Sequence, residues 1–158
     1  MNDTQARVRQ IEARLARWHR ASPVSRLLAT VPGVGIIGAS AIAATVSDPN
    51  LFRSGREFAA WLGMTPRQNS SGGKERLGRT SKRGDKYIRC LLVAGAVAIL
   101  RHARTRATKD GEWLRAMLAR KPPKVVAVAL ANRTARIVWA VMKRGGAYQP
   151  KEIFGQAA

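Results

Sequence analysis

The sequence contains a single cysteine and few acidic residues. One cysteine, Cys90, cannot form an intramolecular disulfide, and this indicates the cytoplasm. Nine Asp and Glu residues stand against 29 Lys and Arg residues in a chain of 158, which gives a formal net charge of +20. A compact body with this charge repels itself unless an anion lies on it. We therefore expect a polyanionic partner.

Long apolar runs are also missing. The longest, Cys90 to Leu100, is shorter than the roughly 20 residues that a bilayer span requires, and no basic-then-apolar leader opens the chain. Basic residues are interspersed through every segment, so we expect nucleic acid rather than membrane as the partner. Cys90 lies inside the apolar run, and we expect it to be buried as a small hydrophobic residue.

The pattern of a metal centre is absent as well. There is no Cys-x-x-Cys motif and no pair of histidines at helical spacing, and the nine acids are scattered. Asp110 and Glu112 are close in sequence, but two residues apart they point to different sides of a helix. A two-metal nuclease needs several converging carboxylates. We expect no metal site on this chain and no autonomous metal nuclease.

Helical periodicity covers most of the chain and predicts an all-α fold. From Asp3 to Arg20 an apolar seam recurs at steps of three and four, with arginines on the other faces. This spacing is typical of a coiled coil, and two and a half repeats do not distinguish a coiled coil from a helix packed on its own domain. We expect His19 to be solvated. The seam is formed by Val8, Ile11, Leu15 and Trp18.

The segment Val31-Pro32-Gly33-Val34-Gly35, followed by an apolar helix, resembles a helix-hairpin-helix motif. In that motif Gly33 and Gly35 would let the hairpin backbone approach closely, and amides at the start of the second helix would face a phosphate oxygen. Such binding carries no sequence specificity. The alternative is a tight helix connection without a ligand.

Local signals place the remaining helices. Ser54 and Glu57 form a capping box for a helix that carries Phe58 and Trp61, which with Phe52 we expect to be core aromatics. The segment after Gly84 is the most apolar, and we expect it to be the buried central helix. The last helix ends at Gly145-Gly146.

A polar, glycine-rich, basic loop from Thr65 to Arg89 separates two apolar segments. Lys86 and Arg89 would begin the next helix, where cations oppose the helix dipole, so a bound phosphate would relieve the conflict. We expect these cations to bind nucleic-acid phosphate. They are Arg67, Lys74, Arg76, Arg79, Lys82, Arg83, Lys86 and Arg89.

The same loop contains Ser70-Ser71-Gly72-Gly73. A serine can attack phosphate if it is deprotonated and cations or amides hold the developing negative charge. The cations are present and the sequence identifies no base. A flexible turn is the other interpretation of such a loop.

Several motifs occur together, in order and at natural spacing, between Leu27 and Gly146. Besides the two glycine-containing motifs above, they are Asp48-Pro49-Asn50-Leu51-Phe52-Arg53-Ser54, Phe58-Ala59-Ala60-Trp61-Leu62-Gly63-Met64-Thr65-Pro66-Arg67 and Ser81-Lys82-Arg83-Gly84-Asp85-Lys86-Tyr87-Ile88-Arg89. This set resembles the C-terminal transposase domain of DEDD-type bacterial insertion-sequence transposases, also described as bridge-RNA-guided recombinases. The first helix resembles the end of the coiled coil that joins the two halves of that family.

The resemblance implies that Ser71 is the nucleophile that forms a covalent phosphoserine link to DNA, with Ser70 as the competing assignment. It also implies DNA and guide RNA as partners, a homo-oligomer, and a bacterial cytoplasmic, nucleoid-associated location. Family members carry an N-terminal RuvC-like domain whose Asp-Glu-Asp-Asp carboxylates hold a divalent metal such as Mg²⁺. This sequence lacks that half, so we expect no cofactor on it and little catalysis by it alone.

We therefore expect three segments and a role in DNA recombination of a mobile element. The segments are a coiled-coil-like helix at 1–22, a domain at 23–146 with the hairpin and the serine loop, and a tail at 147–158. The alternative function is a non-enzymatic, basic helix-hairpin-helix module that binds nucleic acid. A dimerisation unit built on the first helix is a third interpretation.

Overall fold

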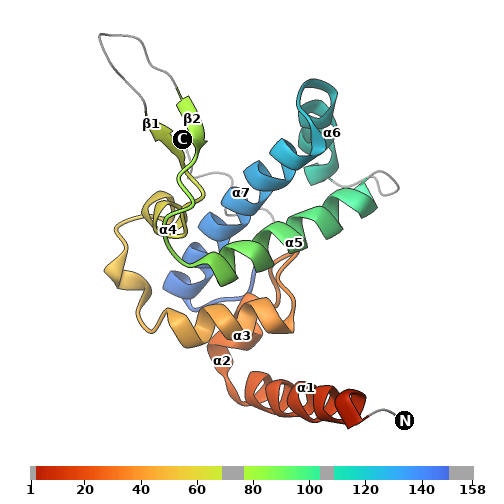
Figure 1. The fold of residues 1–158 in the computed structure, drawn as a ribbon. Helices are drawn as coiled ribbons and strands as arrows, with labels where there is room; N and C mark the ends of the chain where they lie inside the picture. The colour runs from red at the N-terminus through yellow and green to blue at the C-terminus, as the bar shows by residue number, and fades with distance from the viewer. Residues whose placement is uncertain (1–2, 69–76, 104–108, 150–158) are drawn as a thin grey trace.

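The computed structural model describes residues 3–68, 77–103 and 109–149. The described chain is helical, which confirms the all-α class, and it adds one short antiparallel ribbon (Figure 1). The α-helices are α1 (Asp3–Ala21), α2 (Pro23–Leu28), α3 (Ile36–Thr45), α4 (Gly55–Trp61), α5 (Lys86–Ala103), α6 (Lys109–Arg120) and α7 (Pro123–Arg144). A 3-10 helix, η1 (Pro49–Leu51), precedes α4, and the ribbon pairs β1 (Pro66–Gln68) with β2 (Leu77–Thr80).

Local sequence sets several of these helix ends. The Ser54 hydroxyl accepts a hydrogen bond from the Glu57 amide at 3.3 Å, and the Glu57 carboxylate accepts one from the Arg53 amide at 2.7 Å. The capping box is confirmed, although the carboxylate reaches one residue further back than the usual N-cap amide. At the other end of the chain, Gly145 adopts a left-handed φ of 68° and closes α7, as its position predicts.

The central helix of the body is α7. Helices α2, α4, α5 and α6 and the turn η1 all pack on it. Fully burying one of its apolar side chains stabilises the fold by about 1.5–3 kcal/mol. By length and composition α7 could cross a membrane, but half of its apolar window is buried in the body, so core packing explains its composition. Its buried residues are Val126, Ala127, Leu130, Ala131, Thr134, Ala135, Ile137, Val138 and Val141.

The prediction that α5 is the buried central helix is therefore wrong. One stripe of α5, from Ile88 through Leu92 to Leu100, is buried, since its strongest packing is against α7. The opposite side faces outward and includes Cys90, which is exposed. The expectation of a buried thiol is wrong because an apolar helix at the edge of a body buries only the stripe that faces its neighbour.

Helix α1 packs on α2 and α3 through part of its surface. His19 is half-buried and not solvated as expected, because its Nδ1 shares a 2.7 Å hydrogen bond with the hydroxyl of the fully buried Ser25. The Ser25 hydroxyl also lies 3.3 Å from that of Ser40 on α3. This polar chain fixes the end of α1 to the body. The apolar seam remains largely uncovered, with Ile11 64% and Trp18 44% exposed.

The three predicted core aromatics form one cluster beside α7. The ring centroids of Phe52, Phe58 and Trp61 lie 5.1 to 5.8 Å apart. Phe58 is fully buried, whereas Trp61 at the rim is 39% exposed. The indole Nε1 of Trp139 donates to the Pro49 carbonyl at 3.0 Å and so ties α7 to η1. The cluster therefore serves the core rather than forming an open stacking platform.

Candidate nucleic-acid interface

The β1–β2 ribbon is anchored to the helical body by two interlocked glycines. Gly63, with φ 73°, lies so close to the Arg83 backbone that a Cβ would collide with the Arg83 carbonyl oxygen. Gly84, with φ 104°, stands in the same relation to the Trp61 carbonyl oxygen. Two backbone bonds continue the connection, from the Lys82 amide to the Gly63 carbonyl at 3.0 Å and from the Ser81 amide to the Thr65 carbonyl at 2.9 Å. The base of the ribbon is thus fixed in position.

The ribbon carries the chain to the segment that holds the predicted nucleophile. β1 and β2 pair at Pro66 with Thr80 and at Gln68 with Leu77, with a bulge between these pairs. Arg67 and Arg79 lie in the two strands, and the structure describes their backbone. Ser70, Ser71, Lys74 and Arg76 lie outside the described residues, so their assignments stay predictions.

Three predicted phosphate-binding cations lie together at the base of the ribbon and the start of α5. Lys82, Arg83 and Lys86 are exposed, within five residues of one another. Lys82 has φ 54°, a left-handed conformation that costs a side-chain-bearing residue about 1 kcal/mol or more. The bond from its amide to the Gly63 carbonyl holds it in that conformation. The body therefore presents this group of charges to solvent.

The start of α5 already has its own anion. A carboxylate oxygen of Asp85 accepts a hydrogen bond from the Ile88 amide at 2.8 Å, so Asp85 caps the helix. This carboxylate also offsets the unfavourable position of Lys86 in the first turn. The conflict with the helix dipole therefore does not require a bound phosphate, which removes one of the sequence-based reasons for expecting a phosphate there.

Arg89 differs from the other cations because its side chain turns inward. Its Nη1 donates to the Leu62 carbonyl at 2.8 Å, and the residue is half-buried. Leu62 is the C-cap of α4, where a cation is favoured by the dipole of that helix. Arg89 thus joins α4 to α5. Its predicted role in nucleic-acid binding has no support from this geometry.

The two hairpin glycines have different surroundings. Gly33, with φ 80°, lies against α5, where a Cβ would come within 2.7 Å of the Ile99 Cδ1 atom and where Gly95 leaves room for the turn. Gly35 is exposed, has open space around it and caps α3. The close approach that Gly33 permits is therefore to α5. The helix-hairpin-helix interpretation stays a prediction that depends on Gly35 and the amides after it.

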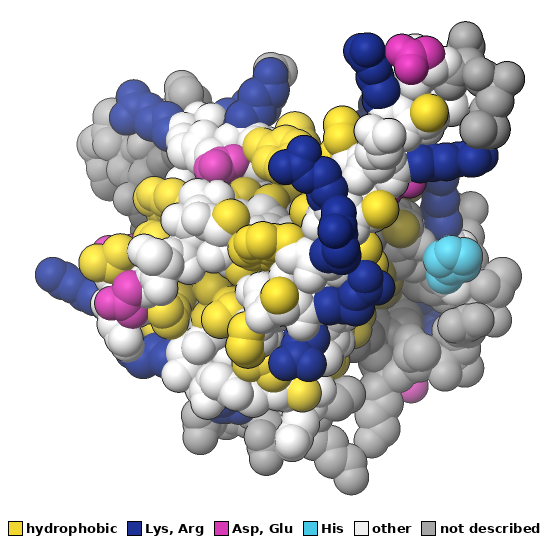
Figure 2. Space-filling model, turned by 90° about the horizontal axis from the view of Figure 1, so that it is seen from below, with side chains coloured by type: hydrophobic (Ala, Val, Ile, Leu, Met, Phe, Trp, Pro, Cys, Tyr) yellow, Lys and Arg dark blue, Asp and Glu magenta, His cyan; other side chains and the backbone are white. Residues whose placement is uncertain are grey.

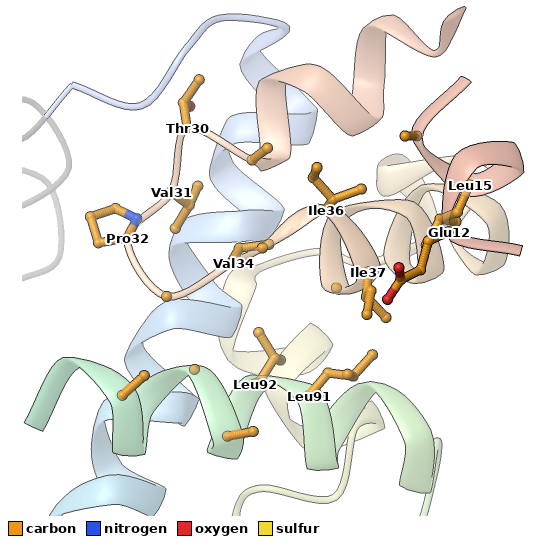
Figure 3. Close-up of a pocket in the computed structure, with 18 residues that line it drawn as sticks. Glu12, Leu15, Thr30, Val31, Pro32, Val34, Ile36, Ile37, Leu91 and Leu92 are labelled. Atoms are coloured by element: carbon orange, nitrogen blue, oxygen red, sulfur yellow. The ribbon is translucent and has the colours of Figure 1, made fainter. Parts of the chain in front are cut away.

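An apolar groove of ≈ 930 Å³ lies beside this turn (Figure 3). Its walls come from α1, the α2–α3 turn and α5, and among the described residues that line it Glu12 alone is charged. Ile36 and Ile37 at the start of α3 are 45% and 50% exposed along it. An apolar wall with a carboxylate does not attract phosphate, so the groove itself is no candidate for anion binding.

Among the residues that the structure describes, no three His, Cys, Asp or Glu side chains lie together.

Sequence reasoning missed the residues that hold the site in place. The pairs Gly63–Arg83 and Gly84–Trp61, and the bond from Arg89 to Leu62, join residues 20 or more positions apart. No local spacing connects them. Gly63 directly follows the C-cap of α4, and its contact with Arg83 follows only from the fold.

Comparison with known proteins places these elements in one family model. The model described as "Transposase IS116/IS110/IS902 family" matches residues 25–111, from α2 into α6. The match therefore includes the α2–α3 turn, the aromatic cluster, the β1–β2 ribbon and the basic loop from Thr65 to Arg89.

Individual proteins that are similar to this chain are also named as transposases. The chain is 49% identical over 148 residues to a "Probable family 20 transposase" of Pseudomonas aeruginosa, covering 89% of this chain and 44% of that protein. It is 42% identical over 120 residues to the "Transposase for insertion sequence element IS1111A" of Coxiella burnetii, covering 76% and 33%. It is 39% identical over 138 residues to the "Transposase for insertion sequence element IS1328" of Yersinia enterocolitica, covering 87% and 41%. The chain thus spans less than half the length of these relatives.

Proposed function

Because the chain belongs to the Transposase IS116/IS110/IS902 family, we propose that it is the serine-carrying part of a DNA recombinase that moves an insertion element. The observation that carries the proposal is the position of the family match. Residues 25–111 contain both candidate serines and the cations around them. Three relatives that align with 76% or more of this chain are named as transposases.

In the proposed reaction the Ser71 oxygen attacks a phosphodiester of DNA. A bond forms between Oγ and phosphorus, the bond from phosphorus to one strand's oxygen breaks, and that strand leaves as a free hydroxyl that takes up a proton. The Ser71 proton passes to a base that the described residues do not identify. Energy stored in the phosphoserine link lets a second strand's hydroxyl reverse the step and rejoin the DNA.

The cations of the basic loop from Thr65 to Arg89 stabilise the negative charge that develops during the reaction. Lys74, Arg76, Arg79, Lys82 and Arg83 hold the phosphates on either side of the attacked bond, where negative charge develops. Lys82 and Arg83 support this role because they are exposed where the β1–β2 ribbon is anchored to the helical body, and Lys86 is exposed beside them. Because the backbone is fixed at this point, phosphate binding requires less reorganisation of the chain.

The remaining parts of the machinery lie outside this chain in our proposal. A RuvC-like domain, in cis or in trans, contributes the Asp-Glu-Asp-Asp carboxylates and the divalent metal. A guide RNA selects the DNA, and the active assembly contains more than one copy. This chain alone binds nucleic acid through the amides at Gly35 and through the basic loop, but it does not exchange strands.

The test is a search for the covalent adduct. The chain, in the longer protein with its RuvC-like domain, is incubated with guide RNA and assembled target DNA, and protein linked to labelled DNA is resolved on a denaturing gel. We expect Ser71→Ala to abolish the adduct and the matched Ser70→Ala variant to retain it. The reverse result would transfer the role to Ser70, and an adduct that persists in the double variant Ser70→Ala, Ser71→Ala would exclude this serine pair.

The second candidate function predicts a different outcome. A non-enzymatic helix-hairpin-helix module would bind DNA with an affinity that falls steeply with salt, would need no guide RNA and would give no adduct with any variant. The exposed Gly35 at the start of α3, with open space around it, is the observation that favours this candidate.

A further inference from the structure

Helix α1 has an arginine-rich face that the proposed site does not use. All five of its arginines are exposed. At 3.6 residues per turn they occupy one continuous arc of roughly 160° around the helix axis. They are Arg7, Arg9, Arg14, Arg17 and Arg20.

This face points away from the body. Leu15 and His19, through which α1 contacts the rest of the molecule, lie on the side opposite the centre of the arginine arc. Figure 2 views the molecule from the side on which α1 lies and shows a row of dark-blue side chains with hydrophobic side chains beside it. Solvent therefore has access to the arginines along the helix.

Little negative charge within α1 neutralises this face. Asp3 forms an ion pair with Arg7, from carboxylate to Nε at 3.2 Å, at side-chain exposures of 81% and 75%. Glu12 lies on the other side of the helix and lines the apolar groove. Exposed ion pairs contribute little free energy, so the face keeps a strong positive potential around Arg14, Arg17 and Arg20.

We propose that α1 is a second nucleic-acid contact, which binds phosphates of duplex DNA through Arg14, Arg17 and Arg20. The arginine face extends about 20 Å along a straight helix, and duplex DNA offers a rigid, regular array of phosphates over that length. Single strands are held by successive aromatic stacking platforms, whereas α1 offers one aromatic, Trp18. Phosphate contacts of this kind fix the position of the protein on DNA without reading sequence.

The inference rests on the proposed function only in that both require DNA, because α1 lies apart from the ribbon and contacts neither β1 nor β2.

The test uses fluorescence anisotropy with a labelled duplex of about 25 base pairs between 50 and 200 mM KCl, a range over which phosphate contacts lose affinity steeply. The variant is Arg14→Gln, Arg17→Gln, Arg20→Gln. The matched control, Arg115→Gln, Lys121→Gln, Lys124→Gln, removes three exposed charges from α6, the residue that follows it and the start of α7.

We expect the α1 variant to lower the slope of log affinity against log salt by about 2 to 3 and to weaken binding about 10- to 100-fold at 100 mM KCl. The control should change affinity less than about threefold. Replacing the same three arginines by lysine should restore the slope, since lysine also binds phosphate as a point charge. Far-UV circular dichroism reports the helix content of each variant, and α1 contains no fully buried residue whose packing the changes would disturb.

Three results overturn the inference. They are an unchanged slope in the glutamine variant, equal losses in the variant and the control, or a loss for single- or double-stranded RNA with duplex DNA binding intact. If the unsubstituted chain binds no DNA at all, the proposed function fails as well. That result is distinct from failure of the α1 contact alone.

Discussion

At the scale of single residues, glycines determine how the ribbon joins the body. Gly63 and Gly84 both have left-handed φ values, and each would collide with a backbone carbonyl if it carried a Cβ. A backbone atom cannot move aside as a side-chain tip can. The ribbon base and the end of α4 are therefore in contact at a distance that only glycine permits. This contact fixes the position of the backbone that carries the exposed cations beside Gly84.

We expect Gly63→Ala to lower the free energy of unfolding by about 2–5 kcal/mol, since the left-handed backbone and the collision each contribute. Gly145→Ala is the matched control because its φ of 68° is similar and a Cβ there meets open space. It should cost about 1 kcal/mol. Urea unfolding followed by tryptophan fluorescence measures both values. Equal losses would mean that the interlock adds nothing to the conformational cost.

At the scale of elements, local signals predicted the helices well and their environments less well. The Ser54–Glu57 box and Gly145 each act within one turn, so the sequence alone located those helix ends. Whether α5 or α7 is central depends on which faces meet, and apolar content does not decide it, because α5 is the more apolar helix and yet α7 is the one on which the others pack. Cys90 and His19 were misplaced for the same reason, since burial is decided by neighbours distant in sequence.

In the candidate site, too, some features could be predicted from the sequence and others could not. Its cations could be named from composition and spacing, but their separation into outward and inward groups could not. Lys86 and Arg89 lie one turn apart on α5, and Arg89 alone reaches the carbonyl end of α4. The deciding contact is with Leu62, 27 residues earlier in the chain.

This separation predicts opposite effects for two substitutions on α5. Arg89→Met should cost about 1 kcal/mol of stability, because the hydrogen bond to Leu62 is lost while the apolar stem is kept. It should leave the salt dependence of DNA binding unchanged. Lys86→Met should change stability by less than about 0.5 kcal/mol and lower the salt slope by about 1. Thermal unfolding and anisotropy on the same samples give both readouts, and the assignment is wrong if the two variants exchange behaviour.

At the scale of the whole molecule, positive charge is distributed over separate elements around one apolar core. The ribbon base, α1 and the ends of α5 and α7 all carry exposed Lys or Arg, whereas the core beneath them is apolar. A net charge of +20 on this body opposes folding by self-repulsion and favours any polyanion that relieves it. If the chain binds DNA as proposed, folding stability and DNA affinity are coupled through the same charges, with opposite dependence on salt.

We expect the free chain to gain stability as NaCl rises from about 0.01 to 0.15 M, while the screening length falls from about 30 to 8 Å. The gain should be on the order of 1 kcal/mol, or about 3 °C in melting temperature, and should level off above this range. A continued linear rise would instead indicate a general salt effect on apolar burial. With excess duplex DNA the melting temperature should be higher at low salt and should fall as salt is added, because binding to the folded state weakens. Differential scanning calorimetry with and without DNA measures both trends, and a melting temperature of the free chain that falls with salt would contradict self-repulsion as the main influence of salt on folding.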